Sequence, residues 1–305
     1  MKKIVLVTLA LVLSASALTI FSAGSLSIPL REVASVYQSK YHDKVYIEFS
    51  GSVQAVRKIV ELGRCPDLLF VADYSLIPTM MPSQWVVGFA SNVMTLTYVN
   101  PSLTNQLRKD WIGTLMTHTF AFSNPNMDPA GYRTLGVLAL AALKDPRALK
   151  ILERINGVKV EMKNGNVTVY VYPNIRSGNG VIIRDKSVDL IPMVKSGLVD
   201  IAFEYRSVAI QHKLLYYVPP SYCNLGDPKE ANFYGRVKIV LMAGTPKEKV
   251  IKLKPIVYGV TIPTCAPHPA QALKFFQLVL SGTGREIFMK NGQNFLNEMV
   301  FVPPK

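Results

Sequence analysis

The sequence predicts an α/β protein of two lobes, each built on a mainly parallel sheet flanked by helices, with a ligand cleft between the lobes. Three observations support this prediction. Strand and helix patterns alternate along the chain, a second alternating set begins near residue 92, and a late strand pattern at 254–263 has no partner set of its own. The late strand is therefore expected to return to the first lobe.

The first lobe is expected to contain residues 18–91 and 255–305. Apolar residues at helical spacing and runs of β-branched and aromatic residues mark its elements. The expected helices are 30–41, 53–63, 269–282 and 284–295, and the expected strands are 44–52, 67–73 and 254–263. Gly63 is a plausible stop for the second helix, so the order at the start of the chain is that of an α/β unit.

The second lobe is expected to contain residues 92–254. Its expected strands are 92–99, 118–124, 199–205, 214–220 and 236–244, and its expected helices are 128–144 and 190–197. A polar, Asn- and Gly-rich insert at 156–180 is expected to form strands and turns. Strands and helices again alternate in this segment, which predicts a second sheet with its own helices.

Composition narrows the classes of function. The 305 residues are 49% hydrophobic and 18% charged, an ordinary globular mixture that is long enough for two cores. The net charge is +14, yet Lys and Arg are scattered and form no basic helix face with stacking aromatics. This distribution of charge argues against nucleic acid as a partner and favours a small anion or an anionic membrane surface.

The N-terminus predicts export. Lys2 and Lys3 precede an apolar run, and Ala15, Ser16 and Ala17 form a small-residue cleavage site, so residues 1–17 are expected to be a signal peptide. An uncleaved signal anchor is the alternative, because the apolar run is almost long enough to span a bilayer. In both cases the remainder of the chain lies outside the cytoplasm.

The three cysteines, Cys65, Cys223 and Cys265, match no zinc pattern. At most one disulfide can form among them, and the sequence does not select the pair. Free or buried thiols are the expectation.

Loops rich in small residues follow several of the predicted strands. Gly24 and Ser25 precede the first helix, Ser50 to Ser52 precede the second, and Asp128 to Gly131 lead into the helix at 128–144. Free N–H groups and the helix dipole at such places attract anions, and small residues let the backbone approach a ligand. Ordinary helix capping by Ser and Asp explains each loop taken alone. Several together favour an oxyanion site in the cleft.

Two carboxylates lie among these strand ends, Asp128 and Glu204. Ionised, they would repel a dianion. They make sense if they bind a positive centre, and a high-valent metal inside an oxyanion can accept hard oxygen ligands, whereas sulfur in sulfate cannot. The alternatives are an N-cap for Asp128, and for Glu204 a surface carboxylate paired with Arg206 or a catalytic acid.

Several segments together resemble one family, the archaeal-type extracytoplasmic tungstate/molybdate-binding proteins of ABC importers. The segments are AGSLSIPL, FSGSVQAVRKI, CPDLLFVADYSLI, DPAGYRTLGVLAL, SGLVDIAFEYRSVAIQH and YGVTIP. The resemblance covers almost the whole chain after the signal segment, and DPAGYR and FEYRSVAIQH are its specific motifs. It implies the two-lobed periplasmic-binding-protein-like fold (type II), which closes on one oxyanion.

The resemblance also implies the ligand-binding residues. Asp128 and Glu204 match the Asp and Glu that complete a six-coordinate metal, Ser25 and Ser52 match the serine donors, and backbone amides near Gly24, Ser52 and Ala130 are expected to help. The expected ligand is tungstate or molybdate, which share charge and nearly share size. The implied partner is the permease of an ABC transporter, and the protein is expected to be a monomer without a cofactor.

Two other functions compete with this one. The first is a receptor for another tetrahedral oxyanion, such as sulfate or phosphate, against which the two carboxylates argue. The second is an enzyme on the same fold, because fold does not fix function. The four histidines, His42, His118, His212 and His268, lie in no metal-binding or catalytic-triad motif, so no catalytic residue is expected.

Overall fold

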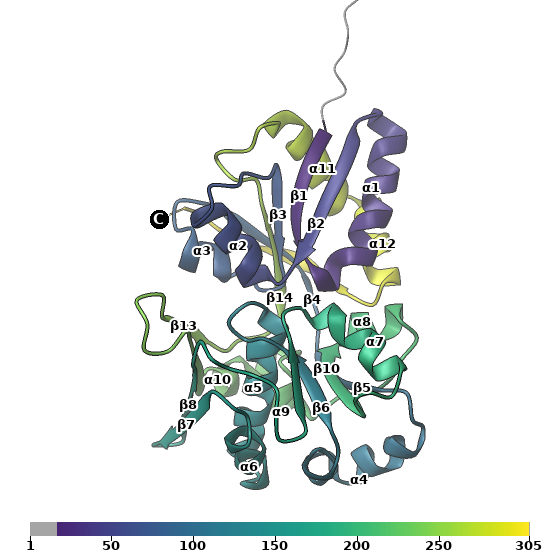
Figure 1. Ribbon diagram of the computed structural model, residues 1–305. Helices are drawn as coiled ribbons and strands as arrows, with labels where there is room; N and C mark the ends of the chain where they lie inside the picture. Colours follow the sequence, from purple (N-terminus) through teal and green to yellow (C-terminus); the bar gives the residue numbers. More distant parts are fainter. Residues whose placement is uncertain (1–16, 305) are drawn as a thin grey trace, which may run out of the picture.

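The structure is a computed structural model that describes residues 17–304, and it has two lobes, one above the other in Figure 1. Within these residues the upper lobe is built on a six-stranded sheet in the order β15-β4-β14-β3-β1-β2. Its strands are β1 Ala17–Ala23, β2 Lys44–Ser50, β3 Leu68–Val71, β4 Val86–Ser91, β14 Val257–Thr261 and β15 Asn294–Val302.

Helices cover both faces of the upper sheet. The helices of this lobe are η1 Gly24–Leu26, α1 Ser27–Tyr41, α2 Ser52–Val60, α3 Leu76–Met80, α11 Pro269–Leu280 and α12 Gly282–Lys290. α1, α11 and α12 lie together on one face, whereas α2 and α3 lie on the other (Figure 1). Strand β3 is fully buried: Phe70 packs into one hydrophobic cluster, and Leu69 and Val71 into the other. A strand that is covered on both sides has the continuous apolar run seen in the sequence.

The lower lobe holds two sheets among the described residues. One has the order β11-β5-β10-β6-β9 and the other the order β13-β12-β8-β7. Their strands are β5 Met94–Tyr98, β6 Phe120–Ser123, β7 Val158–Lys163, β8 Asn166–Val171, β9 Val181–Arg184, β10 Ile201–Tyr205, β11 Leu215–Tyr217, β12 Val237–Leu241 and β13 Lys249–Lys252.

Helix α5, Pro129–Ala142, is the centre of the lower lobe. Every residue of this helix is buried, and it packs against both β10 of the first sheet and β12 of the second. A helix that is apolar all round needs such a buried position. The other helices are α4 Ser102–Thr117, α6 Arg147–Glu153, η2 Ser187–Asp189, α7 Leu190–Lys195, α8 Arg206–Gln211, α9 Ser221–Asn224, η3 Pro228–Glu230 and α10 Ala231–Tyr234.

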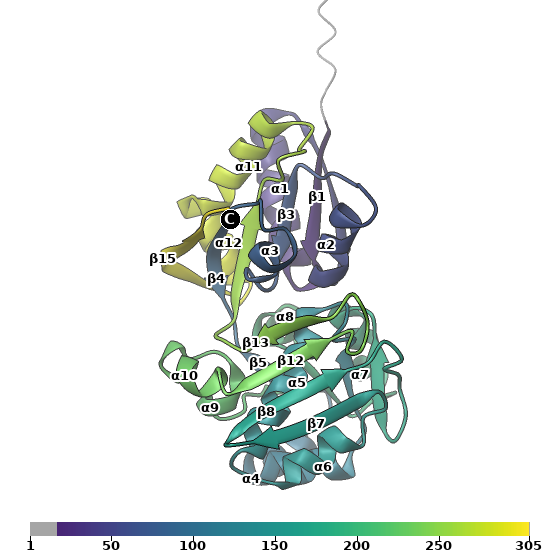
Figure 2. The same ribbon diagram turned by 90° about the vertical axis from the view of Figure 1, so that its left-hand side faces the viewer.

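The predicted fold class is confirmed, but the sheets are mixed. β1 pairs in parallel with β2 and β3, whereas β14 is antiparallel to β3 and β4. Strands from 17–91 and 257–302 form the upper sheet, and the chain passes between the lobes at 91–94 and 252–257. Figure 2 shows both passages between the upper and lower parts. The predicted lobe limits, 18–91 with 255–305 and 92–254, stay a prediction about domains.

Two expectations about elements were incomplete. The segment 284–295 was expected to be helical, but its helix ends at Lys290 and β15 begins at Asn294. Strands were expected in the insert at 156–180, and β7 and β8 are there, but they join β12 and β13 in a sheet of their own. Helical spacing alone does not show where a helix gives way to an edge strand.

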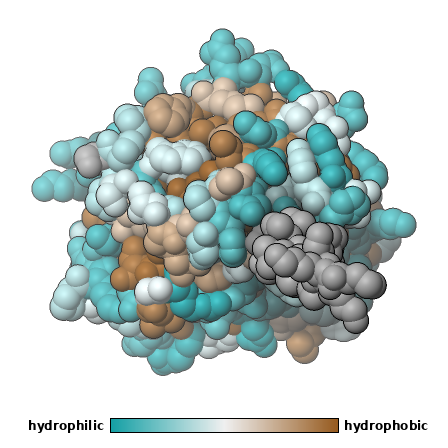
Figure 3. Space-filling view, turned by 90° about the horizontal axis from the view of Figure 1, so that it is seen from above, coloured by the Kyte–Doolittle hydropathy of each residue, from teal (hydrophilic) through white to brown (hydrophobic). Residues whose placement is uncertain are grey.

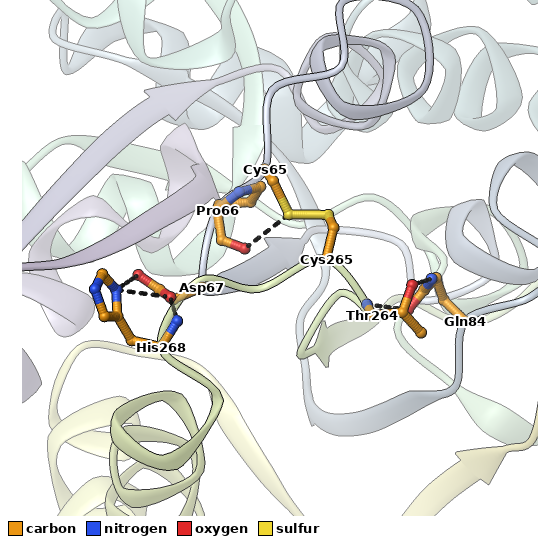
Figure 4. Close-up of a disulfide and its surroundings, with 7 residues drawn as sticks. All are labelled: Cys65, Pro66, Asp67, Gln84, Thr264, Cys265 and His268. Carbon is orange, nitrogen blue, oxygen red and sulfur yellow. Dashed lines mark hydrogen bonds and ion pairs between the residues drawn. A yellow bond between two sulfur atoms is a disulfide. The ribbon is translucent and has the colours of Figure 1, made fainter.

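The expectation of free thiols was wrong for two of the three cysteines. Cys65 and Cys265 form a disulfide across 200 residues of sequence, while Cys223 is free and buried. The bond joins the loop before β3 to the loop after β14 (Figure 4). Beside it, Thr264 N donates to Gln84 Oε1 at 3.0 Å and His268 N donates to Asp67 Oδ1 at 2.7 Å. The loop is thus held on both sides of the disulfide.

The predicted signal peptide, 1–17, lies outside the described residues except for Ala17, which begins β1. No helix among residues 17–304 has the length and apolar character to cross a bilayer. The face seen from above in Figure 3 mixes hydrophilic side chains with apolar ones near its middle and at its lower left, a mixture that is normal for a protein surface.

Candidate functional site

Loops at the ends of strands from both lobes meet between the lobes. Gln54 N, in the upper lobe, donates to the Met127 carbonyl of the lower lobe at 3.2 Å. A Cβ at Gly51 would collide with that same carbonyl, and a Cβ at Gly24 would lie 3.1 Å from Val188 Cγ2. The two glycines therefore permit a close approach of the lobes. Gly24, Ser52 and Asp128, predicted from separate segments, are brought to this one boundary.

The upper lobe contributes buried hydroxyls. Ser25 in η1 and Ser50 at the end of β2 are buried, and neither Oγ has a well-aligned hydrogen-bond partner, although the Ser25 hydroxyl is close enough to Tyr258 to lower the pKa of that phenol. Ser52 begins α2, and its Oγ accepts from Ala72 N at 2.9 Å. Because a hydroxyl both donates and accepts, this bond orients Ser52 and leaves its O–H free to donate. All three serines can therefore donate to an oxyanion.

Asp128 is both an N-cap and a buried carboxylate. Its Oδ1 accepts from Ala130 N at 3.2 Å, as the capping alternative predicted, and its Oδ2 accepts from Ser187 N at 2.8 Å. The Ala130 N–H, expected to face the ligand, thus supports Asp128. Burial raises the pKa of Asp128, and the two backbone N–H groups partly offset that effect.

Glu204 is the most unusual group at this boundary. The residue is fully buried at the end of β10; its Oε2 accepts from Tyr205 N at 3.3 Å, and its Oε1 has no partner. Burial and the negative charge of Asp128 raise the pKa of Glu204 well above its ordinary value, and the Tyr205 N–H and the Ser187 hydroxyl offset only part of that rise. The alternative of a surface carboxylate paired with Arg206 is wrong, because Glu204 is fully buried and Arg206 Nη2 instead donates to Asn294 Oδ1 at 3.1 Å.

Sequence reasoning missed Ser123 and gave Ser50 no role of its own. Ser123 ends β6 and is fully buried; its Oγ has no well-aligned hydrogen-bond partner, but it lies close enough to Asp128 to lower the pKa of that carboxyl. A Cβ at Gly131 would collide with the Ser123 carbonyl, which places this strand end against the first turn of α5. The available signal was position: Ser50 and Ser123 are both the last residues of strands that precede a candidate loop.

The boundary thus combines neutral donors with two buried carboxyl groups. A buried polar atom without a partner costs free energy, so the unpaired oxygens of Ser25, Ser50, Ser123 and Glu204 would be stabilised by a polar ligand. Hydroxyls can donate to the oxygens of an anion. A carboxylate oxygen can bind an electron-poor metal, and a protonated carboxyl can donate a hydrogen bond.

Comparison with known proteins places the chain in a family. The family model described as bacterial extracellular solute-binding protein matches residues 18–294. An uncharacterized solute-binding protein of Staphylothermus marinus is 44% identical over 300 residues, covering 93% of this chain and 85% of the relative. The molybdate/tungstate-binding protein WtpA of Pyrococcus abyssi is 38% identical over 301 residues, covering 93% and 86%.

Solved structures share the fold. The periplasmic molybdate-binding protein of Azotobacter vinelandii superposes with a TM-score of 0.63 at 18% identity, covering 92% of this chain and 99% of that one. The sulfate-binding protein SubI of Mycobacterium tuberculosis gives a TM-score of 0.60 at 11% identity, covering 92% and 88%. With two lobes, a polar boundary between them and a family match over most of its length, the chain belongs to the bacterial extracellular solute-binding proteins.

Proposed function

We propose that this protein captures tungstate or molybdate between its lobes, outside the cytoplasm, and delivers the anion to the permease of an ABC importer. The observation that carries the proposal is Glu204 Oε1, a buried carboxyl oxygen without a partner, beside Asp128 and unpaired serine hydroxyls. The WtpA proteins of Pyrococcus abyssi and Thermococcus kodakarensis, named for these two anions, are each 38% identical to this chain.

The serines and the carboxylates would contact different atoms of the anion. Ser25, Ser50, Ser52 and Ser123 would donate hydrogen bonds to the oxygens of the anion, as would backbone N–H groups near Gly24. Asp128 and Glu204 would supply oxygen ligands to the metal itself, which distinguishes tungstate and molybdate from sulfate. The serines therefore bring affinity for oxyanions in general, and the carboxylates bring selectivity.

Closure of the lobes would complete the site. The hydroxyls of Ser25 and Ser50 come from the upper lobe, whereas Asp128, Glu204 and Ser123 come from the lower lobe. Hinge closure of two lobes around a ligand is a known mode of conformational change, and the two passages at 91–94 and 252–257 are the places for the hinge. We propose that the closed protein docks, as a monomer, on the permease.

Calorimetry with defined anions tests this function. Wild-type protein is titrated with sodium tungstate, molybdate, sulfate and phosphate, and then Asp128→Asn and Glu204→Gln are titrated in the same way. The amides keep the side-chain size, but they are weaker metal ligands, so each change should reduce tungstate affinity about 100-fold or more. X-ray absorption of bound tungsten should show six ligands in wild type and fewer in the variants.

The control is Asp227→Asn. Asp227 also caps a helix, since its Oδ1 accepts from Lys229 N at 2.9 Å, but it lies in the loop before η3, and its change should leave tungstate binding intact. Binding of sulfate without tungstate would establish the other tetrahedral-oxyanion receptor instead. Tungstate selectivity that survives both carboxylate changes would show that the carboxylates do not touch the metal. The family and the relatives are solute-binding proteins, and we propose no turnover.

A further inference from the structure

A buried ion pair joins the lobes next to the candidate site. Asp73 follows β3 in the upper lobe, and Tyr132 and Arg133 lie in the first half of α5 in the lower lobe. Tyr132 Oη donates to Asp73 Oδ2 at 2.7 Å, and Arg133 Nη2 lies 3.5 Å from the same oxygen. Each of the three residues is at most 2% exposed, so the charges are removed from water.

Arg133 also connects the parts that hold the proposed ligands. Its Nη1 donates to the Ala72 carbonyl at 2.7 Å and to Tyr205 Oη at 2.8 Å. The N–H of Ala72 holds the Oγ of Ser52, and Tyr205 directly follows Glu204. The Arg133 guanidinium therefore contacts both Ala72, whose N–H binds the proposed donor Ser52, and Tyr205, which directly follows the proposed ligand Glu204.

The ion pair between Asp73 and Arg133 is sensitive to the loss of either charge. Burial alone would raise the pKa of Asp73, but the charges of Arg133 and Lys254 hold it below its ordinary value, so Asp73 is a buried carboxylate. Removing one partner of a buried ion pair leaves the other charge uncompensated, and that is strongly destabilising. Asp73 Oδ1 also accepts from Ser75 N and Ser75 Oγ within the upper lobe, and an Asn at this position keeps that oxygen, so the cost of losing the charge falls on the contact between the lobes.

We propose that Asp73, Tyr132 and Arg133 are a latch that stabilises the closed lobes and sets the rate of ligand release without touching the ligand. The proposal rests on the function above for the identity of the ligand. The three are positioning residues: they hold Ser52, Asp128 and Glu204 in one arrangement through Ala72, α5 and Tyr205. A change that raises the free energy of the closed state should raise the apparent Kd by the corresponding factor.

Binding kinetics and melting separate a latch from a core contact. The variants Asp73→Asn and Tyr132→Phe are compared with wild type by stopped-flow mixing with sodium tungstate and by thermal melting with and without the anion. We expect the dissociation rate to rise about 30-fold or more for Asp73→Asn and about 10-fold for Tyr132→Phe, with the association rate nearly unchanged. The Tm of the unliganded protein should be unchanged, and the gain in Tm on adding tungstate should shrink.

Tyr37→Phe is the matched control. Tyr37 Oη also donates to an aspartate, Asp43 Oδ2 at 3.2 Å, but both residues belong to the upper lobe. Its change should leave the dissociation rate as in wild type, whatever it does to Tm. In a double variant, Tyr132→Phe should add little to Asp73→Asn, because both remove the same bond.

Two outcomes would overturn the latch. One is an unchanged dissociation rate in both variants. The other is a fall in Tm that is equal with and without the anion, which would show that the contacts support the fold in every state. If wild type binds sulfate and not tungstate, the same measurements are made with sodium sulfate. Failure of the tungstate assignment is thus distinguished from failure of the latch.

Discussion

At the residue scale, burial of Glu204 costs the unliganded protein stability. Its carboxyl is fully buried, one oxygen has no partner, and its pKa is raised well above the ordinary value by burial and by Asp128. A raised folded-state pKa means that the folded protein prefers the protonated form. The stability that this preference gives is complete below the unfolded pKa, near 4.5, and is lost as pH rises through the folded pKa.

Glu204→Gln should therefore stabilise the unliganded protein in a pH-dependent way. Near pH 4 the two proteins should melt alike, because Glu204 is protonated in both the folded and the unfolded state. At pH 8 the variant should melt a few degrees higher, because unfolding lets Glu204 release its proton and ionise in water, which favours the unfolded state of the wild type, whereas Gln has no proton to release. Thermal melting from pH 4 to pH 8 measures the difference.

Glu298→Gln is the control for this prediction, because Glu298 is an exposed residue of β15. It should show no difference from wild type that grows with pH. If the Glu204→Gln variant melts at or below the wild-type temperature at pH 8, the raised pKa of Glu204 does not lower the stability of the wild type there.

Some site residues could be predicted from sequence, and others depend on the opposite lobe. Asp128, with Pro129 behind it, follows local capping rules, so its position at a helix start was predictable. Ser50 and Ser123 were not singled out, because a serine at a strand end is common and the sequence does not show that its side chain is buried in the fold. Likewise, no local pattern pairs Arg133 with Asp73, which lies 60 residues earlier in the chain.

At the scale of elements, the start of α2 lies against the opposite lobe, where Gln54 N donates to the Met127 carbonyl. Gly51 has φ −63° and ψ 142°, which any residue can adopt, so its glycine is not needed for backbone conformation. A Cβ would instead collide with the Met127 carbonyl of the opposite lobe. The side chain is excluded only when the lobes are together.

Gly51→Ala should therefore weaken tungstate binding and spare the unliganded fold. Overpacking costs about 1–3 kcal/mol, so we expect the Kd to rise roughly 10- to 100-fold, with no loss of unliganded Tm. Calorimetry and melting measure the two effects. Gly282→Ala is the control, because a Cβ at Gly282 would meet open space, and its Kd should equal that of wild type. Equal affinities of Gly51→Ala and wild type would show that this contact does not limit closure.

Elements with a long apolar pattern were predicted correctly. The prediction failed where a helix is followed closely by a strand, as α12 is by β15. Helix α5 and strand β3 were predictable because burial on all sides leaves a continuous apolar run. The end of α12 was missed, although Asn291 and Gly292 are a local stop signal and Gly292 has a positive φ of 86°. Sheet membership, as in the separate sheet of β7 and β8, depends on long-range pairing that periodicity does not contain.

At the scale of the whole molecule, the disulfide should stabilise the upper lobe without affecting the ligand. Cys65 and Cys265 both lie in upper-lobe loops, so the bond does not cross between the lobes. The double change of Cys65→Ser and Cys265→Ser should lower the free energy of unfolding by about 2–4 kcal/mol and leave tungstate affinity unchanged.

Melting with and without a reductant checks this prediction. Reduction of the wild type should lower Tm toward that of the double variant. Cys223→Ala, which alters the free thiol, should respond to the reductant as wild type does. A wild-type Tm that is indifferent to complete reduction would contradict the assigned stabilisation. The pairing itself was beyond sequence reasoning, because 200 residues separate the two cysteines and only the folded sheet brings them together.

The same bond makes the lower lobe a covalent loop. All strands of the two lower sheets lie between residues 94 and 252, inside the span that Cys65 and Cys265 close. A protease that cuts the chain once within the lower lobe would therefore release no fragment: the two pieces would migrate together on a gel until a reductant separates them. In the proposed setting outside the cytoplasm, one broken peptide bond in the lower lobe would therefore not detach that lobe from the protein.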